Sequence, residues 1–378
     1  MRIGYDLDSL TLRSGGIGRY GVNLINHVAK MLLDEPGNEI FIFSHRSFDR
    51  SRVIKHKNLN FIDKHTRIKS NVLRKAIFLP FSLRSIKMNL FHGVDHIGIP
   101  FLYKSKTCKY VVTIHDLITR IYPRSFPIKQ RLVQNTLLPH ILRGADKIIV
   151  DSLSTKNDVM KYYPRHAKKV MVIYPGVESQ FYPRRRDEVR EVLNKYNIHF
   201  KYLLFLGTLE PRKNIVRLIE AFISLKQEGD VEHKLVITGR KGWLYKEILE
   251  KIQQSPFSKD IVFTDFVDDE DLPYLYSGAE IFIYPSLYEG FGLPVLEAMA
   301  CGTPVIASNL SSLPEVTADA GVLIDPLNVE EIIQAMEKLS TDSKLREELQ
   351  QKGLERAKLF SWERVAKETV ELYREVIG

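Results

Sequence analysis

Two glutamates, Glu289 and Glu297, flank the stretch of the chain whose residue types most clearly point to chemistry. An apolar run over 279–284 predicts a buried strand, residues 290–292 supply a glycine-containing loop, and a helix is expected to begin near Leu293. A helix N-terminus favours an anion, because its first backbone N–H groups are unpaired and its dipole is positive there. Carboxylates disfavour a bare phosphate, so we expect the glutamates to accept hydrogen bonds from hydroxyls attached to it. Phosphates with hydroxyls at both ends describe a nucleotide-sugar.

Residues 207–214 (Gly-Thr-Leu-Glu-Pro-Arg-Lys-Asn) place two cations just before another predicted helix. The loop begins at Gly207, after an apolar run. Arg212 and Lys213 are electrostatically misplaced at a helix N-terminus, because the dipole there favours anions. This misplacement predicts a bound anion, namely the phosphates held by the 290–292 loop. An exposed basic turn is the alternative.

Two short motifs in the first half of the chain follow predicted strands. Gly15 and Gly16 open the first predicted helix. Their spacing is not the dinucleotide-binding fingerprint, but they would let backbone amides approach a ligand closely. A glycine turn without a ligand is the alternative. His115 and Asp116 end an apolar strand over 110–114, where a doubly wound sheet places its active site, and the pair favours a functional role over a structural one.

Acidic residues elsewhere give weaker signals. Most of the segment 265–272 is expected to be the solvated start of a helix, although Phe266 and Val267 could line a pocket for a nucleotide base. Asp6 and Asp8 resemble a metal-binding acidic pair, but no other carboxylate or histidine cluster lies near them in the sequence. We therefore expect a structural role for this pair, no metal and no cofactor.

Length and composition constrain the class of protein. A chain of 378 residues exceeds the size at which single cores usually stop growing, so two domains are expected. No apolar run reaches the roughly 18 residues of a membrane span, and residues 1–6 lead directly into the first predicted strand without the apolar core of a signal peptide, so we expect none. Cys108 and Cys301 show no metal-ligand or redox spacing. We expect a reducing, cytoplasmic setting and no nucleic-acid partner.

Positive charge is concentrated in the first half of the chain. Residues 1–178 hold 30 Lys+Arg against 13 Asp+Glu, whereas residues 179–378 hold 25 against 33. Within 46–88, twelve basic residues stand against two acidic ones and alternate with aromatic and aliphatic residues. Such a segment suits peripheral docking on anionic lipid headgroups, or binding of an anionic acceptor. A solvated basic face is the alternative, and the sequence leaves the choice open.

Short apolar runs alternate with longer helix-period segments, which predicts an α/β fold of parallel sheets with crossover helices. A Pro- and Gly-containing linker over 174–183 divides the series into two doubly wound, Rossmann-like halves, 1–178 and 179–360. Ligands bind at the carboxyl ends of such strands, so a cleft between the halves is expected. The predicted strands are 2–5, 39–43, 90–92, 110–114, 147–150, 170–173, 202–206, 234–238, 261–263, 279–284, 304–307 and 321–324, and the predicted helices include 17–32, 129–142, 155–162 and 362–376.

Together these motifs resemble the retaining glycosyltransferases of family four. The resemblance is carried by the spacing Glu289-x7-Glu297, its Glu-Gly-Phe-Gly-Leu-Pro context, the 207–214 loop, the Gly-Gly-Ile-Gly-Arg-Tyr loop at 15–20 and the closing Phe-Ser-Trp at 360–362. It spans nearly the whole chain and implies the GT-B architecture. The second domain would hold the nucleotide-sugar and the first the acceptor. The resemblance also implies that the last helix, within 361–378, crosses back to pack on the first domain.

The resemblance further implies a role for each motif residue. Glu297 would bind the ribose hydroxyls, whereas Glu289 and the 290–293 amides would hold the donor sugar. Arg212 and Lys213 would neutralise the diphosphate. Gly15 and Gly16 would contact the diphosphate, and His115 would lie against the transferred sugar. The residues expected to act in catalysis are His115, Arg212, Lys213 and Glu289, and those expected to bind the donor are Gly15, Gly16, Asp116, Gly207, Arg212, Lys213, Val267, Glu289, Gly290, Phe291, Gly292, Leu293 and Glu297.

The expected reaction is hexose transfer from a nucleotide-sugar to a hydroxyl of a glycan or lipid-linked acceptor in cell-surface polysaccharide assembly. The Ile-His-Asp-Leu stretch at 114–117 resembles mannosyl- and glucosyltransferases of the family, which makes GDP-mannose the leading donor. Cations and a helix N-terminus would stabilise the leaving diphosphate without a metal. The alternatives are UDP-glucose or UDP-N-acetylglucosamine as donor, a nucleotide-sugar epimerase of the same fold, a glycosidase using Glu289 and Glu297, and a non-catalytic nucleotide-sugar-binding protein.

Overall fold

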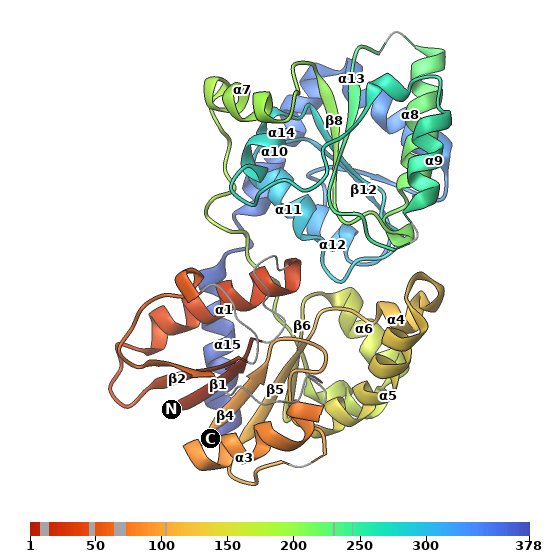
Figure 1. Cartoon of the computed structure of the whole chain (residues 1–378). Helices are drawn as coiled ribbons and strands as arrows, with labels where there is room; N and C mark the ends of the chain where they lie inside the picture. Colours follow the sequence, from red (N-terminus) through yellow and green to blue (C-terminus); the bar gives the residue numbers. More distant parts are fainter. Residues whose placement is uncertain (8–14, 45–49, 64–72, 103, 230, 244) are drawn as a thin grey trace. The chain divides into compact units, whose positions relative to one another are not determined.

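The chain folds into two compact units (Figure 1). The computed structural model describes residues 1–378 except 8–14, 45–49, 64–72, 103, 230 and 244. Unit 1 comprises Met1–Gly176 and Ser361–Gly378, and unit 2 comprises Val177–Phe360. The predicted division after residue 178 lies two residues beyond the observed one. Asp8 and parts of the basic segment, 46–49 and 64–72, lie outside the described residues.

Unit 1 is built on a parallel sheet of seven strands in the order β3-β2-β1-β4-β5-β6-β7. The strands are β1 (Arg2–Asp6), β2 (Glu39–Ser44), β3 (Leu59–Asp63), β4 (Leu90–Gly93), β5 (Lys109–Ile114), β6 (Lys147–Val150) and β7 (Val170–Val172). The central strands are almost wholly buried, as expected where helices cover both faces. All six strands predicted in this half are present, but the prediction omitted β3. This strand lies at the sheet edge, where residues 60–62 are only partly buried and Asn60 interrupts the apolar run.

Helices pack on both faces of the unit 1 sheet. They are α1 (Gly16–Leu32), α3 (Leu79–Ile86), α4 (Ile118–Ile121), α5 (Ile128–Gly144), α6 (Leu153–Tyr162) and α15 (Trp362–Ile377), with a π-helical turn η2 (Arg74–Phe78) before α3. Alternate residues of each strand enter opposite cores. Ile40 and Ile42 of β2 join the core that includes α1 and α15, whereas Phe41 and Phe43 join the core that includes α3 and α5.

The last helix, α15, packs beside α1 in unit 1, which confirms the crossing-back that the resemblance implied (Figure 1). The Tyr373 hydroxyl lies 2.5 Å from Nδ1 of His92 and 3.0 Å from the hydroxyl of Tyr5, inside the core. A Cβ at Gly176 would lie 2.5 Å from the backbone N of Trp362. Glycine at that position therefore lets the segment that leaves unit 1 pass close to the segment that returns.

Unit 2 repeats the architecture with a parallel sheet of six strands in the order β10-β9-β8-β11-β12-β13. The strands are β8 (Tyr202–Leu206), β9 (Lys234–Thr238), β10 (Ile261–Phe263), β11 (Ile281–Tyr284), β12 (Val305–Ser308) and β13 (Val322–Ile324). The helices are α7 (Arg186–Lys195), α8 (Ile215–Glu228), α9 (Lys246–Gln254), α10 (Leu272–Gly278), α11 (Leu293–Ala300), α12 (Leu313–Thr317), α13 (Val329–Thr341) and α14 (Ser343–Ala357), with a 3-10 turn η5 (Pro211–Lys213) before α8. All six predicted strands of this half are present. Within the described residues of both units, no helix is long and apolar enough to cross a membrane.

Candidate active site

The glycine loop predicted after residue 284 connects β11 to α11 at the carboxyl end of the unit 2 sheet. Gly292 precedes the helix with a φ of 112°, a conformation that favours glycine. A Cβ there would also lie 2.5 Å from Cδ2 of Leu313, so the fold itself requires this glycine. The helix begins at Leu293, and no side chain caps it. The positive end of its dipole therefore lies at the carboxyl ends of the unit 2 strands, where the sequence predicts an anion site.

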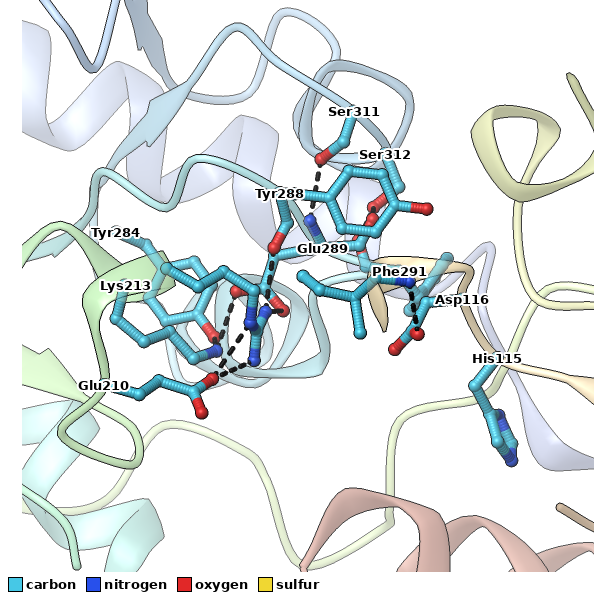
Figure 2. A network of polar contacts seen from close by, with 12 residues as sticks. His115, Asp116, Glu210, Lys213, Tyr284, Tyr288, Glu289, Phe291, Ser311 and Ser312 are labelled. Carbon is cyan, nitrogen blue, oxygen red and sulfur yellow. Dashed lines mark hydrogen bonds and ion pairs between the residues drawn. The ribbon is translucent and has the colours of Figure 1, made fainter. Parts of the chain in front are cut away.

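Glu289, just before this loop, is the centre of a buried ion-pair cluster (Figure 2). Its Oε2 lies 2.7 Å from Nη1 of Arg212, and its Oε1 lies 2.7 Å from Nζ of Lys213. Burial alone would raise the pKa of Glu289, but the two cations lower it to about 2. The carboxylate is therefore ionised at neutral pH. The structure thus brings together three of the predicted site residues.

Arg212 and Lys213 have further partners in the same cluster. The Nε and Nη2 of Arg212 both donate to Oε1 of Glu210, with Nε 2.9 Å away. The Nη1 of Arg212 donates to the carbonyl oxygen of Tyr288 at 2.8 Å. Lys213 also donates to the hydroxyl of Tyr284. Every one of these side chains is held by at least one partner within unit 2 (Figure 2).

The two cations that the sequence assigns to a bound anion already have carboxylate partners within unit 2. The formal charges of Arg212 and Lys213 are balanced by those of Glu210 and Glu289. Burial lowers the pKa of Lys213, and the neighbouring guanidinium lowers it further, while Glu289 opposes both effects. The assignment of the cations to a diphosphate stays a prediction, and it now requires the ligand to compete with Glu289.

Two other predicted donor residues of unit 2, Gly207 and Val267, follow β8 and β10, the two strands that flank β9 in the sheet. Gly207 directly follows β8. Gly239 follows β9 and has a φ of 147°, and a Cβ on Gly239 would lie 1.9 Å from the carbonyl oxygen of Gly207. Val267 is buried after β10, whereas Phe266 is 41% exposed. The guanidinium of Arg240 lies 4.4 Å from the Phe266 ring centre. The base pocket expected at Phe266 and Val267 stays a prediction.

Glu297 lies inside α11 and is almost fully buried. The hydroxyl of Tyr276 donates to its Oε2 at 3.0 Å. Burial raises the pKa of the Cys301 thiol, and the Glu297 carboxylate raises it further. The role of Glu297 as a receptor for ribose hydroxyls stays a prediction.

In unit 1, Gly15 precedes α1 and Gly16 is its first residue. Gly15 has a φ of −70°, which any residue can adopt. Among the described residues, a Cβ at Gly15 would meet no heavy atom within 4 Å. Neither backbone conformation nor packing within the described structure therefore requires glycine here. A close approach of a ligand would supply the missing reason.

His115 directly follows β5, and its carboxylate partner is Asp151 rather than the adjacent Asp116. Nδ1 lies 2.6 Å from Oδ2 of Asp151, at the end of β6, and Nε2 lies 2.9 Å from the carbonyl oxygen of Val94. Successive residues of an extended chain point in opposite directions, and the Asp116 carboxylate instead lies 3.6 Å from Nε2 of His96. Burial alone would lower the pKa of His115, but Asp151 raises it to about 9. Asp151 therefore favours the charged imidazole, and both ring nitrogens have partners within unit 1.

Several residues of these clusters were missed by the motif reasoning. Ser311 Oγ accepts a hydrogen bond from the backbone N–H of Glu289 at 2.9 Å. Ser312 Oγ donates to the carbonyl oxygens of Glu289 and Phe291 at 3.0 and 2.7 Å. These serines fix the backbone of the glycine loop, yet a serine pair in a turn carries no specific sequence signal. Glu210 could have been found, because it lies in the same loop as the predicted cations.

The described residues include no group of three or more His, Cys, Asp or Glu side chains that could hold a metal ion. Asp6 is buried at the end of β1, 3.1 Å from Nη2 of Arg74 and 2.5 Å from Nζ of Lys75. These contacts give Asp6 an ion-pairing role within unit 1.

Comparisons with known proteins match both units. The model described as "Glycosyltransferase Family 4" matches residues 14–181, and "Glycosyl transferases group 1" matches residues 186–356. The chain is 31% identical to O-antigen chain mannosyltransferase B of Escherichia coli over 99% of this chain and 100% of that protein. It is 29% identical to the serotype-specific mannosyltransferase WbdA of Escherichia coli over 94% of this chain, which is 44% of that longer protein.

A solved structure, sucrose-phosphate synthase from Thermosynechococcus elongatus, superimposes with a TM-score of 0.78 at 23% identity, over 99% of this chain and 98% of that one. This likeness shows the GT-B fold, and the family matches define the protein as a glycosyltransferase. The full-length similarity narrows the class further. The chain belongs to glycosyltransferase family four.

Proposed function

We propose that the protein is a retaining mannosyltransferase that uses GDP-mannose and a glycan or lipid-linked acceptor in cell-surface polysaccharide assembly. The relative matched over its full length is named an O-antigen chain mannosyltransferase, which supports the sugar and the type of product. The observation that carries the donor assignment is the cluster of Arg212, Lys213 and Glu289 beside the N-terminus of α11. Cations and a helix N-terminus suit a diphosphate, and a carboxylate suits sugar hydroxyls.

In this proposal the bond from the sugar anomeric carbon to the β-phosphate oxygen breaks while the bond to the acceptor oxygen forms on the same face. The leaving diphosphate gains negative charge, which Arg212 and Lys213 stabilise. The acceptor proton passes to the leaving phosphate oxygen. The scheme gives His115 no part in that proton transfer, because Asp151 and the carbonyl oxygen of Val94 engage its two ring nitrogens.

Unit 2 binds the donor in this scheme, and unit 1 binds the acceptor. Glu289 exchanges its cation partners for hydroxyls of the donor sugar when the diphosphate arrives. Glu297 takes the ribose hydroxyls, and Gly15 with Gly16 contacts the diphosphate. Because Arg212 and Lys213 supply the positive charge that the leaving group needs, we propose that turnover does not require a divalent metal.

Thermal unfolding with four nucleotide-sugars tests the donor. Binding to the folded state raises stability with the logarithm of ligand concentration over Kd, so equal concentrations rank the donors. GDP-mannose should raise Tm more than UDP-glucose, UDP-N-acetylglucosamine or ADP-glucose. A larger shift with a UDP-sugar would overturn the GDP-mannose assignment, and no shift with any donor would overturn the donor site.

Turnover assays separate the reaction classes. A transferase releases nucleoside diphosphate only when an acceptor is present. An epimerase instead converts the nucleotide-sugar to its epimer without an acceptor, and a binding protein does neither. The acceptor to use is a mannose-terminated oligosaccharide, with and without a lipid diphosphate. Excess EDTA should leave the rate unchanged, and a loss restored by Mg²⁺ would contradict metal independence.

We also propose that η2 and α3 rest on an anionic membrane surface on the cytoplasmic side. Leu73, Ile77 and Phe81 are spaced four residues apart and are 50%, 44% and 64% exposed. They lie within the 46–88 segment, in which basic residues far outnumber acidic ones. Arg74 and Lys75 are buried against Asp6, so the exposed cations of this stretch are Arg84 and Lys87. Exposed apolar side chains near such cations suit a membrane interface with anionic headgroups.

Sedimentation with lipid vesicles tests this surface. The protein should bind vesicles that contain phosphatidylglycerol and leave neutral phosphatidylcholine vesicles unbound. Ile77→Glu should reduce binding severalfold, whereas Leu327→Glu, at a site in unit 2 that is 57% exposed, should not. Equal binding to both vesicle types, or equal loss in both variants, would contradict the proposal.

A further inference from the structure

Glu210 belongs to the ion-pair cluster but has no role in the donor scheme above. It directly precedes η5, and only 2% of its surface is exposed. Its Oε1 accepts hydrogen bonds from both Nε and Nη2 of Arg212. A carboxylate buried this completely costs free energy unless a partner compensates it, and Arg212 is that partner.

Different groups hold the two sides of the Arg212 guanidinium. Glu210 occupies the side formed by Nε and Nη2. On the other side, Nη1 contacts the carbonyl oxygen of Tyr288 at 2.8 Å and Oε2 of Glu289 at 2.7 Å. A diphosphate that approaches the glycine loop therefore competes first with Glu289, which lies just before that loop. Glu210 stays attached to the opposite side.

We propose that Glu210 is a positioning residue that keeps the Arg212 guanidinium oriented while the donor diphosphate takes the place of Glu289. This inference rests on the proposed function, because a bound diphosphate is what gives Arg212 its task. The two glutamates then divide the work. Glu289 exchanges partners during donor binding, and Glu210 keeps its partner throughout.

The effect of Glu210 should appear in the chemical step. A guanidinium held in place before the reaction stabilises developing charge without reorganising, and a displacement of about 1 Å can cost about 100-fold in rate. Interactions that strengthen only in the transition state change kcat more than KM. A purely structural carboxylate would change Tm and leave the kcat of the folded enzyme intact.

Three substitutions separate geometry from charge. Glu210→Gln keeps the length and an oxygen that accepts from Nε and Nη2, so kcat should fall by less than about 5-fold. Glu210→Asp keeps the charge but is one methylene shorter, and Glu210→Ala removes both, so each should lower kcat by about 30-fold or more. Donor KM should change by less than about 3-fold in all three. A role through charge alone would reverse the order of the Gln and Asp variants and overturn the proposal.

The matched control is Glu280→Ala. Glu280 also pairs with an arginine, Arg346, at 2.8 Å, but it precedes β11 at the opposite end of the sheet. This variant should lose Tm and keep kcat within about 2-fold, because its pair lies away from the reacting groups. The Gln variant keeps the test valid if Glu210→Ala fails to fold.

Arg212→Ala distinguishes failure of this inference from failure of the donor scheme. If Arg212→Ala keeps full kcat, the donor scheme itself is wrong. If Arg212→Ala loses activity while folded Glu210→Asp and Glu210→Ala keep theirs, only the positioning role is wrong. If both assignments hold, the double variant Glu210→Ala/Arg212→Ala should be no slower than Arg212→Ala alone, because Glu210 acts through Arg212.

Discussion

Both units bury a carboxylate against a cation at the carboxyl ends of parallel strands, yet the two pairs leave different possibilities for a ligand. In unit 1, Asp151 pairs with His115, whose second nitrogen is taken by a backbone carbonyl. In unit 2, Glu289 pairs with both Arg212 and Lys213, beside a helix N-terminus that no side chain caps. We call the His115–Asp151 pair closed, because both imidazole nitrogens already have partners and leave no place for a ligand. The cations beside Glu289 form the exchangeable pair, because an incoming anion could take the place of Glu289. A buried ion pair therefore indicates a binding site only when its neighbourhood can receive the incoming charge.

The two pairs also respond to pH in opposite directions. The pKa of Glu289 is lowered to about 2, so its stabilising contribution is complete above the unfolded value near 4.5 and is lost as pH falls toward 2. The pKa of His115 is raised to about 9, so its contribution is complete below 6.5 and is lost as pH rises through 9. Acid should therefore weaken unit 2 at this site, and alkali should weaken unit 1.

The largest effect on activity should come from removing a cation of the exchangeable pair. Arg212→Ala removes a cation from the proposed leaving-group site, so kcat should fall by about 100-fold. It also leaves Glu210 and Glu289 with less compensation, so the free energy of unfolding should fall by about 3 kcal/mol. Steady-state kinetics and urea unfolding measure the two effects separately.

Arg346→Ala is the control for that change. Its partner Glu280 lies at the amino end of β11, so stability should fall while kcat stays within about 2-fold of the unaltered protein. Unchanged kcat in Arg212→Ala would remove this residue from the reaction and make the two pairs functionally alike.

A smaller effect is expected from Asp151→Asn, which removes the carboxylate charge from the closed pair. A rise in the His115 pKa from 6.5 to about 9 corresponds to at most about 3 kcal/mol below pH 6.5. The variant should be less stable than the unaltered protein at pH 6, and the difference should shrink as pH rises through 9. Urea unfolding at pH 6 and pH 9.5 measures this, and kcat at pH 7 should fall only a few-fold.

The pH dependence of the difference is decisive for the closed pair. A stability gap of equal size at both pH values would mean that Asp151 acts through packing rather than through the charge of His115. His115→Gln provides the control, because it removes the titrating group and should abolish the same pH window.

The α/β fold was readable from the sequence because buried parallel strands leave continuous apolar runs. All six strands of unit 2 could be predicted for this reason. The exception was β3, a partly buried edge strand in which Asn60 interrupts the apolar run. The other edge strands, β7, β10 and β13, consist of apolar residues only, so they could be predicted.

The chemistry of the site was less readable, because ion partners come from distant parts of the chain. Lys213 and Glu289 are separated by 76 positions, and His115 and Asp151 by 36. Composition and spacing could assign Lys213 and Glu289 to one ligand, but nothing local showed that they pair with each other. Asp116 is adjacent to His115 in the sequence, yet the carboxylate that contacts His115 belongs to Asp151, and Asp116 faces His96.

The smallest effect, and the sharpest contrast between the units, should come from the two glycine loops. Gly292→Ala places a Cβ 2.5 Å from Leu313 at a φ of 112°, so it should cost about 1–3 kcal/mol of stability. Gly15→Ala meets no described atom within 4 Å at an ordinary φ of −70°, so Tm should not fall.

If Gly15 instead contacts the donor, its methyl group would obstruct the ligand and raise donor KM a few-fold. Tm without ligand and KM for the donor distinguish the two cases. An unchanged KM in Gly15→Ala would leave the glycine a simple turn residue, and the donor would then be held by unit 2 alone. A raised KM at unchanged Tm would identify the unit 1 loop as a ligand contact, because the described fold gives no other reason for glycine at that position.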